Sequence, residues 1–160
     1  MPNPLFDTLF APLAGQNRPL LHPATGAPLS AADFAMQVAQ LAGALQAMGV
    51  QPGDRVAVQV AKSPQALALY GAAVAAGAVF LPLNTAYTAT EVAYFVGNAT
   101  PRLVVCDPDR AAALAPVCAA HAARLLTLGA DGTGSLTELA ASQPARFAPV
   151  PPPYRHDSPC

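Results

Sequence analysis

Residues 74–107 read VAAGAVFLPLNTAYTATEVAYFVGNATPRLVVCD, and they show an alternation of helix and strand patterns. An alanine-rich helix stops at Gly77, because glycine accepts the left-handed conformation after a helix. The apolar run 78–81 predicts a short buried strand, and a polar loop follows it. Thr88-Ala-Thr-Glu91 is a capping box that begins a second helix. The uninterrupted apolar run Leu103–Cys106 is typical of a strand buried on both faces.

The same alternation extends to both sides of this stretch. The pattern of a helix N-cap occurs at residues 30–33, at Ser63 and at residues 135–138. The pattern of a helix stop occurs at Gly49 and Asn98. They predict helices over about 30–48, 64–76, 88–98, 108–123 and 135–142, and strands over 55–60 and 125–128. The proline-rich residues 1–29 are expected to be irregular, with short strands at 20–22 and 27–29 around a Thr25-Gly26 turn.

Strands alternate with helices four times, which predicts an α/β fold with a mainly parallel sheet and helices on both faces. We expect one domain over residues 1–142. Residues 143–160 form a proline-rich segment that is expected to be a linker or a surface crossing rather than part of the core. Ligands of such sheets bind beyond the carboxyl ends of the strands.

Composition excludes several classes of protein. The net charge is −1, with four Tyr, six Phe, no Trp and no basic stripe, so nucleic acid is not an expected partner. Residues 66–83 carry no charge, but glycines and Pro82 divide them into two short elements, so no membrane span is expected. The N-terminus lacks a signal peptide pattern. Three scattered cysteines indicate reduced thiols and a cytoplasmic protein.

Most residues that could do chemistry have simpler explanations. Residues 129–134, GADGTG, follow a strand, but their spacing fits neither G-x-G-x-x-G nor a Walker loop, so a flexible surface turn is expected. Cys118 and His121 lie three residues apart without a second pair, so a buried thiol beside a surface histidine is favoured over a metal site. Ser63 is expected to cap a helix. We predict no metal site and no catalytic residue.

The loop at residues 84–87 is the one candidate binding site. Asn84, Thr85 and Tyr87 follow the carboxyl end of a strand, and neither helix nor strand formation requires them. A hydrogen-bonded turn and a ligand-lining loop explain these residues equally well, and both interpretations stay open.

Three segments resemble the adenylate-forming acyl-CoA synthetases, the AMP-binding family. They are GDRVAVQVAKSPQALALYGAAVAAGAVFLPLNTAYT at 53–88, PRLVVCDP at 101–108 and LGADGTGSLTELA at 128–140. The similarity covers roughly residues 5 to 140, the N-terminal part of the family's large domain, and is strongest to the malonate–CoA ligase subgroup. The resemblance implies that Asn84, Thr85, Ala86 and Tyr87 lie beside the tunnel that holds the pantetheine arm of coenzyme A.

The family converts a carboxylate and ATP, with Mg²⁺, into an acyl-adenylate and then transfers the acyl group to coenzyme A. The implied parent reaction is malonate + ATP + CoA to malonyl-CoA + AMP + diphosphate. The family's phosphate loop, TSGTTGxxKG, is expected just after residue 160, so the 160-residue chain is expected to be inactive and to bind no cofactor itself. The alternatives are a ligase for another short-chain acid and a stand-alone, non-catalytic α/β binding module.

Overall fold

Four parallel strands form the central sheet of the computed structural model, which describes residues 2–24 and 26–153. They are β3 (Arg55–Gln59), β4 (Val79–Pro82), β5 (Leu103–Cys106) and β6 (Arg124–Thr127), in the order β4-β3-β5-β6. Val58 pairs with Pro82 on one side and with Val105 on the other, so β3 and β5 lie in the middle. The predicted parallel sheet is confirmed.

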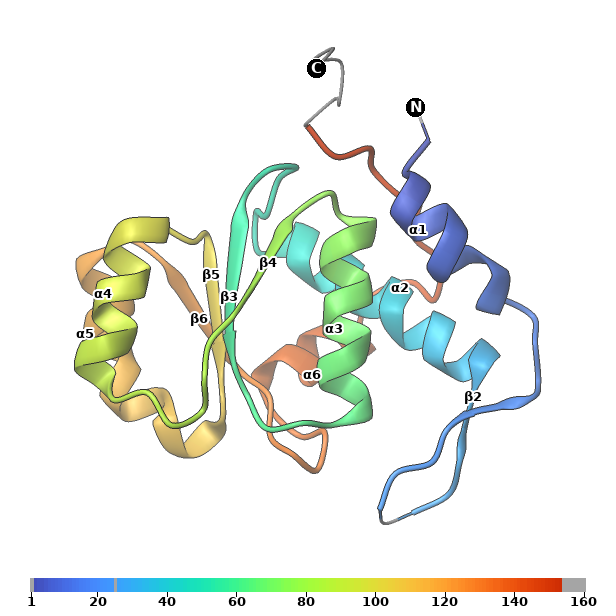
Figure 1. The fold of residues 1–160 in the computed structure, drawn as a ribbon, viewed down its shortest axis with the longest axis horizontal. Helices are drawn as coiled ribbons and strands as arrows, with labels where there is room; N and C mark the ends of the chain where they lie inside the picture. Colours follow the sequence, from blue (N-terminus) through green and yellow to red (C-terminus); the bar gives the residue numbers. More distant parts are fainter. Residues whose placement is uncertain (1, 25, 154–160) are drawn as a thin grey trace, which may run out of the picture.

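Helices cover both faces of this sheet, as predicted. Figure 1 shows α4 (Ala89–Ala99) and α5 (Ala111–Ala120) on one side, with α2 (Ala31–Ala47), α3 (Pro64–Ala75) and α6 (Ser135–Ala141) on the other. Successive side chains of a strand point to opposite faces. The main core cluster therefore lies between the sheet and the three-helix layer, and the strands contribute alternate residues to it. Its members include Phe34, Leu45, Val56, Val58, Leu69, Leu103, Val105, Leu128 and Leu136. The second core cluster lies under the two-helix layer: Ala57, Leu83, Val92, Val96, Val104, Cys106, Leu114 and Cys118.

The N-terminal residues form the two short strands that the sequence predicts, close to the expected positions, and a helix that it does not predict. They form the helix α1 (Pro4–Leu9), the 3-10 turn η1 (Ala11–Leu13) and an antiparallel pair of short strands, β1 (Pro19–Leu21) and β2 (Leu29–Ser30). Asn3 caps α1, since its side chain accepts a hydrogen bond from the Phe6 N–H, and Pro4 occupies the first turn. The prediction that the N-terminal residues are irregular was therefore wrong for residues 4–9, which form α1. Thr25 of the expected turn lies outside the described residues.

Part of the proline-rich segment is tied to the domain. The Val150 N–H donates to the Ala75 carbonyl at 2.7 Å. The Asn3 amide donates to the Val150 carbonyl at 2.9 Å and to the Val74 carbonyl at 2.7 Å. One side chain therefore joins α1, the end of α3 and the segment at 143–153. Residues 154–160 lie outside the described part of the chain.

Three of the four predicted N-caps are confirmed. Ser30 and Ser63 each accept a hydrogen bond from the third following N–H, at 3.0 Å in both cases. Thr88 and Glu91 form a complete capping box. Hydrogen bonds from the Thr88 N–H and hydroxyl hold the pKa of the Glu91 carboxyl below its usual value. The stabilisation that the ionised Glu91 carboxylate gives the folded state is therefore fully present above the unfolded-state pKa of this group. It is lost as the pH falls through the lower folded-state pKa.

The fourth predicted cap, Ser135, was wrong. Gly134 is the N-cap of α6, and the Ser135 hydroxyl instead accepts a hydrogen bond from the Thr127 N–H at 2.9 Å. The Ser135 N–H donates to the Thr127 hydroxyl at 3.0 Å. The serine therefore joins the start of α6 to the end of β6 rather than closing its own helix.

Two other helix boundaries differ from the prediction. α4 runs to Ala99 and is followed by Thr100 in the left-handed conformation at φ 44°, so the stop is not Asn98, whose amide donates to the Tyr94 carbonyl. The helix expected over 108–123 is divided into the 3-10 turn η2 (Pro108–Arg110) and α5, which ends at Ala120. Among the described residues, no helix has the length and apolar character needed to cross a membrane.

We expect Thr88→Ala to lower the free energy of unfolding by about 1 kcal/mol, because the hydroxyl that caps α4 is lost. Urea denaturation of the chain followed by circular dichroism measures this loss. Thr90→Ala is the matched control, since Thr90 is an exposed residue inside the same helix. Equal losses in the two variants would contradict the assignment of Thr88 as a cap.

Candidate functional site at the carboxyl edge of the sheet

The carboxyl ends of the four strands lead into one edge of the molecule. β3 continues into the segment before Ser63, β4 into the loop at 84–87, β5 into Asp107, and β6 into the turn at 129–134. The Asp107 carboxylate accepts a hydrogen bond from the Ala61 N–H at 3.2 Å, which ties the ends of β5 and β3 together. The four strands thus end at one edge, as predicted, and the segments after β3 and β5 contact each other there.

The loop at residues 84–87 is a hydrogen-bonded turn. The Asn84 side-chain oxygen accepts from the Ala86 N–H at 2.9 Å, and the Asn84 carbonyl accepts from the Tyr87 N–H at 3.1 Å. These bonds explain Asn84 structurally, since an Asx turn needs a side-chain acceptor at this position. Asn84, Thr85 and Ala86 are exposed, so they remain accessible to a ligand.

The Tyr87 ring has a fixed position beside α4. It stacks on Phe95 with 5.1 Å between ring centroids and 17° between ring planes. Tyr87 is half-buried and packs against the second core cluster. The tyrosine therefore joins the loop to the two-helix layer.

A buried glutamine that is not among the candidate residues predicted from the sequence lies under this loop. Gln59, at the end of β3, is 1% exposed, and its Nε2 donates to the carbonyls of Asn84 at 2.9 Å and Tyr87 at 3.0 Å. Arg110 Nη2 donates to the same Tyr87 carbonyl at 2.6 Å. Gln59 Oε1 and Arg110 Nε are buried without a hydrogen-bond partner among the described residues. A lone polar residue inside a run of valines was the available signal.

The thiols of Cys106 and Cys118 are not suited to nucleophilic chemistry. Cys106 and Cys118 are buried in the second core cluster. Burial raises the pKa of the Cys106 thiol to about 11, with smaller contributions from Cys118 and Asp107. Burial also raises the pKa of Cys118, while His121 is exposed. The predicted buried thiol beside a surface histidine is confirmed, and the described residues contain no group of three metal-ligating side chains.

The turn at residues 129–134 closes on itself. The Gly129 N–H donates to the Thr133 carbonyl at 2.7 Å, and Asp131 accepts from the N–H and hydroxyl of Thr133. These two bonds lower the pKa of the Asp131 carboxyl. The turn is thus held by hydrogen bonds between its own residues, including one from the Gly132 N–H to the Gly129 carbonyl at 3.0 Å.

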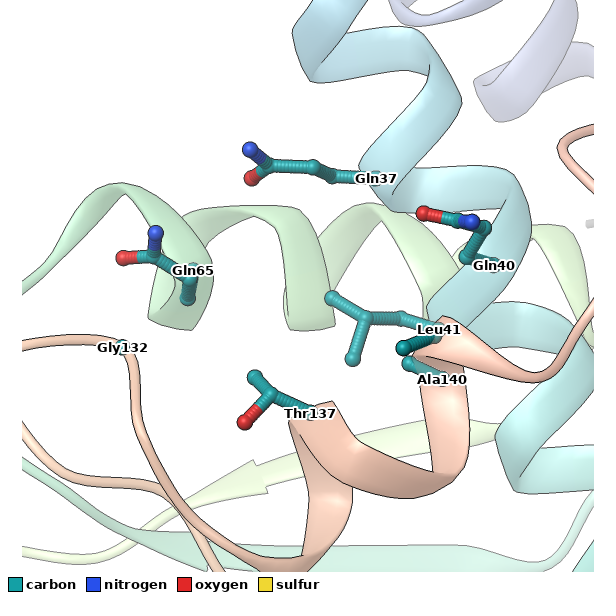
Figure 2. Close-up of a pocket in the computed structure, with 8 residues that line it drawn as sticks. Gln37, Gln40, Leu41, Gln65, Gly132, Thr137 and Ala140 are labelled. Carbon is teal, nitrogen blue, oxygen red and sulfur yellow. The ribbon is translucent and has the colours of Figure 1, made fainter.

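Two hollows lie near the same edge, and the loop at 84–87 lines neither. A cavity of about 190 Å³ lies between α2, α3, α6 and the turn at 129–134, where the side chains of Gln37, Gln65 and Thr137 extend into the same space (Figure 2). A larger groove of about 720 Å³ runs beside β4, with Tyr70 and Phe80 in its lining. Neither hollow carries a paired acid and base.

The sequence profile of one family, described as AMP-binding enzyme, matches residues 14–160. In addition, the fold is similar to that of MatB from Rhodopseudomonas palustris, in a ligand-free and an ATP-bound crystal structure. In both, the TM-score is 0.89 and the identity 44%, over 94% of this chain and 30% of MatB.

Two curated relatives have lower identity. An acyl-CoA ligase, SidI, of Aspergillus fumigatus is 34% identical over 89 residues, which are 56% of this chain and 15% of that protein. A feruloyl-CoA synthase of an Amycolatopsis species is 34% identical over 100 residues, which are 62% of this chain and 20% of that protein. The chain therefore spans less than a third of the length of the proteins it matches here.

Proposed function

The chain belongs to the AMP-binding enzyme family, and from this membership we propose that it forms part of an ATP-dependent acyl-CoA synthetase acting in the cytoplasm. The proposed reaction is malonate + ATP + CoA to malonyl-CoA + AMP + diphosphate. The observation that carries the proposal is the 44% identity to MatB over 94% of the chain. The choice of malonate follows from the resemblance of residues 53–88 and 128–140 to the malonate–CoA ligase subgroup. Residues 1–142 would be an α/β domain, and residues 143–160 would connect it to the rest of the enzyme.

We assign coenzyme A to the loop at 84–87. The exposed Asn84, Thr85 and Ala86 and the fixed ring of Tyr87 offer polar groups and a flat apolar surface at the carboxyl edge of the sheet, where ligands of such sheets bind. These features suit the amide-bearing pantetheine arm. ATP and Mg²⁺ would be bound by the parts of the enzyme outside this chain. The chain by itself is expected to be inactive.

The test uses an enzyme in which this chain replaces the matching 30% of MatB. The two half-reactions are measured separately: ATP–pyrophosphate exchange with malonate reports the acyl-adenylate, and malonyl-CoA formation from preformed adenylate reports the acyl transfer. The proposal predicts that the chimera performs both. A folded chimera without either activity would contradict it.

In this chimera we expect Tyr87→Ala to slow acyl transfer to CoA by ten- to a hundredfold while pyrophosphate exchange changes little. Only the second half-reaction requires the thiol to reach the acyl carbon, and a displacement of about 1 Å can cost about a hundredfold in rate. Tyr94→Ala is the matched control, because Tyr94 lies on the same helix layer and is exposed. Equal effects of Tyr87→Ala on both half-reactions would mean that the loop is only structural.

A ligase for another carboxylic acid is the second candidate. The observation that favours it is the 34% identity to a feruloyl-CoA synthase over 100 residues. Pyrophosphate exchange with a panel of acids, measured on this chain joined to the remainder of its own enzyme, distinguishes the two candidates. A preference for an aromatic acid over malonate would support the second candidate.

A further inference from the structure

We propose that Gln59 and Arg110 are positioning residues that hold the loop at 84–87 in the conformation needed for acyl transfer to coenzyme A. This inference rests on the proposed function of the loop. Neither side chain is offered as a contact to substrate. They act through the backbone carbonyls of Asn84 and Tyr87, which they hold from below.

The Gln59 amide sets the distance between the two ends of the loop. Its single NH₂ group donates both of its hydrogens, one to the carbonyl at the start of the loop and one to the carbonyl at its end. The reversed amide orientation would place Oε1 against two carbonyl oxygens, so these acceptors fix the orientation. β5 also holds the backbone of Gln59, through its pairing with Cys106 and a bond from the Asp107 N–H at 3.2 Å. The amide therefore projects from a rigid strand.

Arg110 adds a charged donor from a different element. It lies at the end of η2 and reaches the Tyr87 carbonyl at 2.6 Å. Hydrogen bonds from a charged donor are shorter and stronger than neutral ones. The carbonyl next to the Tyr87 ring is thus held by two donors, one from β3 and one from η2.

The unpaired atoms of this network argue that it does not exist for stability alone. Gln59 Oε1 and Arg110 Nε are buried without partners among the described residues. A buried unpaired polar atom lowers stability. An apolar side chain of similar shape at position 59 would remove the unpaired Oε1, and the Asn84 and Tyr87 carbonyls would still accept from the Tyr87 N–H and from Arg110 Nη2. The polar residue is therefore better explained by the loop conformation that it fixes than by a contribution to the core.

The experiment compares Gln59→Met and Arg110→Met with Val58→Ala in the MatB chimera. Methionine keeps the length of the glutamine side chain, is shorter than arginine, and removes the hydrogen-bond donors in both variants. Val58 precedes Gln59 on β3, but its side chain lies in the main core cluster, on the opposite face of the sheet. Val58→Ala therefore lowers the stability of the domain without removing a hydrogen bond that holds the loop at 84–87. For each variant, the melting temperature, pyrophosphate exchange, and kcat and KM for CoA in acyl transfer are measured.

We expect Gln59→Met and Arg110→Met to lower kcat/KM for CoA by about tenfold or more with exchange within about twofold of the parent, because a shift of the loop misplaces only the thiol. Val58→Ala should lower the melting temperature and leave the ratio of the two half-reactions unchanged. The double variant Gln59→Met, Tyr87→Ala should lose less transition-state stabilisation in acyl transfer than the two single variants lose in sum, because both changes act on one loop. Arg110→Met decides the test if Gln59→Met does not fold.

Hydrogen exchange separates the possible failures. In the 160-residue chain, Gln59→Met should speed exchange at the Ala86 and Tyr87 amides and leave the β5 amides protected. If Tyr87→Ala alone shows the selective loss of acyl transfer, the positioning role is wrong and the proposed loop function stands. If neither Gln59→Met nor Tyr87→Ala shows a selective loss of acyl transfer, the proposed coenzyme A function of the loop is wrong. Unchanged exchange at both loop amides would overturn the inference directly.

Discussion

Gly134→Ala is expected to destabilise the domain by on the order of 3 kcal/mol, because the new Cβ would both strain the backbone at residue 134 and clash with β6. Gly134 has φ 137°, a conformation that residues with a side chain rarely adopt. A Cβ there would collide with the Thr127 carbonyl oxygen and lie 2.7 Å from the Thr127 carbonyl carbon and 3.1 Å from the Leu128 nitrogen. These atoms belong to the end of β6 and cannot rotate away.

Gly15→Ala is the matched control for this prediction. Gly15 also has a positive φ, 78°, but a Cβ there would have no neighbour within 4 Å. We expect a loss of about 1 kcal/mol from backbone strain alone. Urea unfolding of both variants, followed by circular dichroism, measures the difference. Losses of equal size would show that the contact with β6 is unimportant.

Leu103→Ala is expected to cost about 2–5 kcal/mol, because it leaves a cavity in a central strand. Leu103 begins β5, is 0% exposed and belongs to the main core cluster between the sheet and the three-helix layer. An unfolded or aggregated variant would agree with this range, because domains of this size are stable by only about 5–15 kcal/mol.

Leu67→Ala provides the comparison for Leu103. Leu67 lies on α3 and is 46% exposed, so its truncation should change the unfolding free energy by less than about 0.5 kcal/mol. Both values come from chemical denaturation with a common m-value. A loss for Leu103→Ala as small as that for Leu67→Ala would mean that β5 is not at the centre of the core.

The sheet was predictable because its central strands are unambiguous in sequence. The apolar run Leu103–Cys106 has no polar residue, and such a run needs cover on both faces. Gln59 was not predictable by the same reasoning. The alternation of Val56, Val58 and Val60 defines one buried face and assigns Gln59 to the other, but it does not identify the groups that the Gln59 amide binds. Its partners lie 25 and 28 residues away, so no local pattern identifies them.

The error at Ser135 has a different physical origin. The sequence S-x-x-E satisfies the pattern of a capping box, but a serine hydroxyl bonds to whichever donor is nearest in space. Here that donor is the Thr127 N–H, eight residues earlier. α1 was missed because a six-residue helix with a proline in its first turn has too short an apolar pattern to identify.

The bonds of Asn3 have a consequence for the synthesis of the protein. A ribosome releases a chain from its N-terminus, and domains tend to fold as they emerge. The Asn3 amide, however, is fully paired only when both the Val74 and the Val150 carbonyls are present. Asn3 is translated 147 residues before Val150, so this hydrogen bond of the α1 cap can form only after most of the domain has been synthesised.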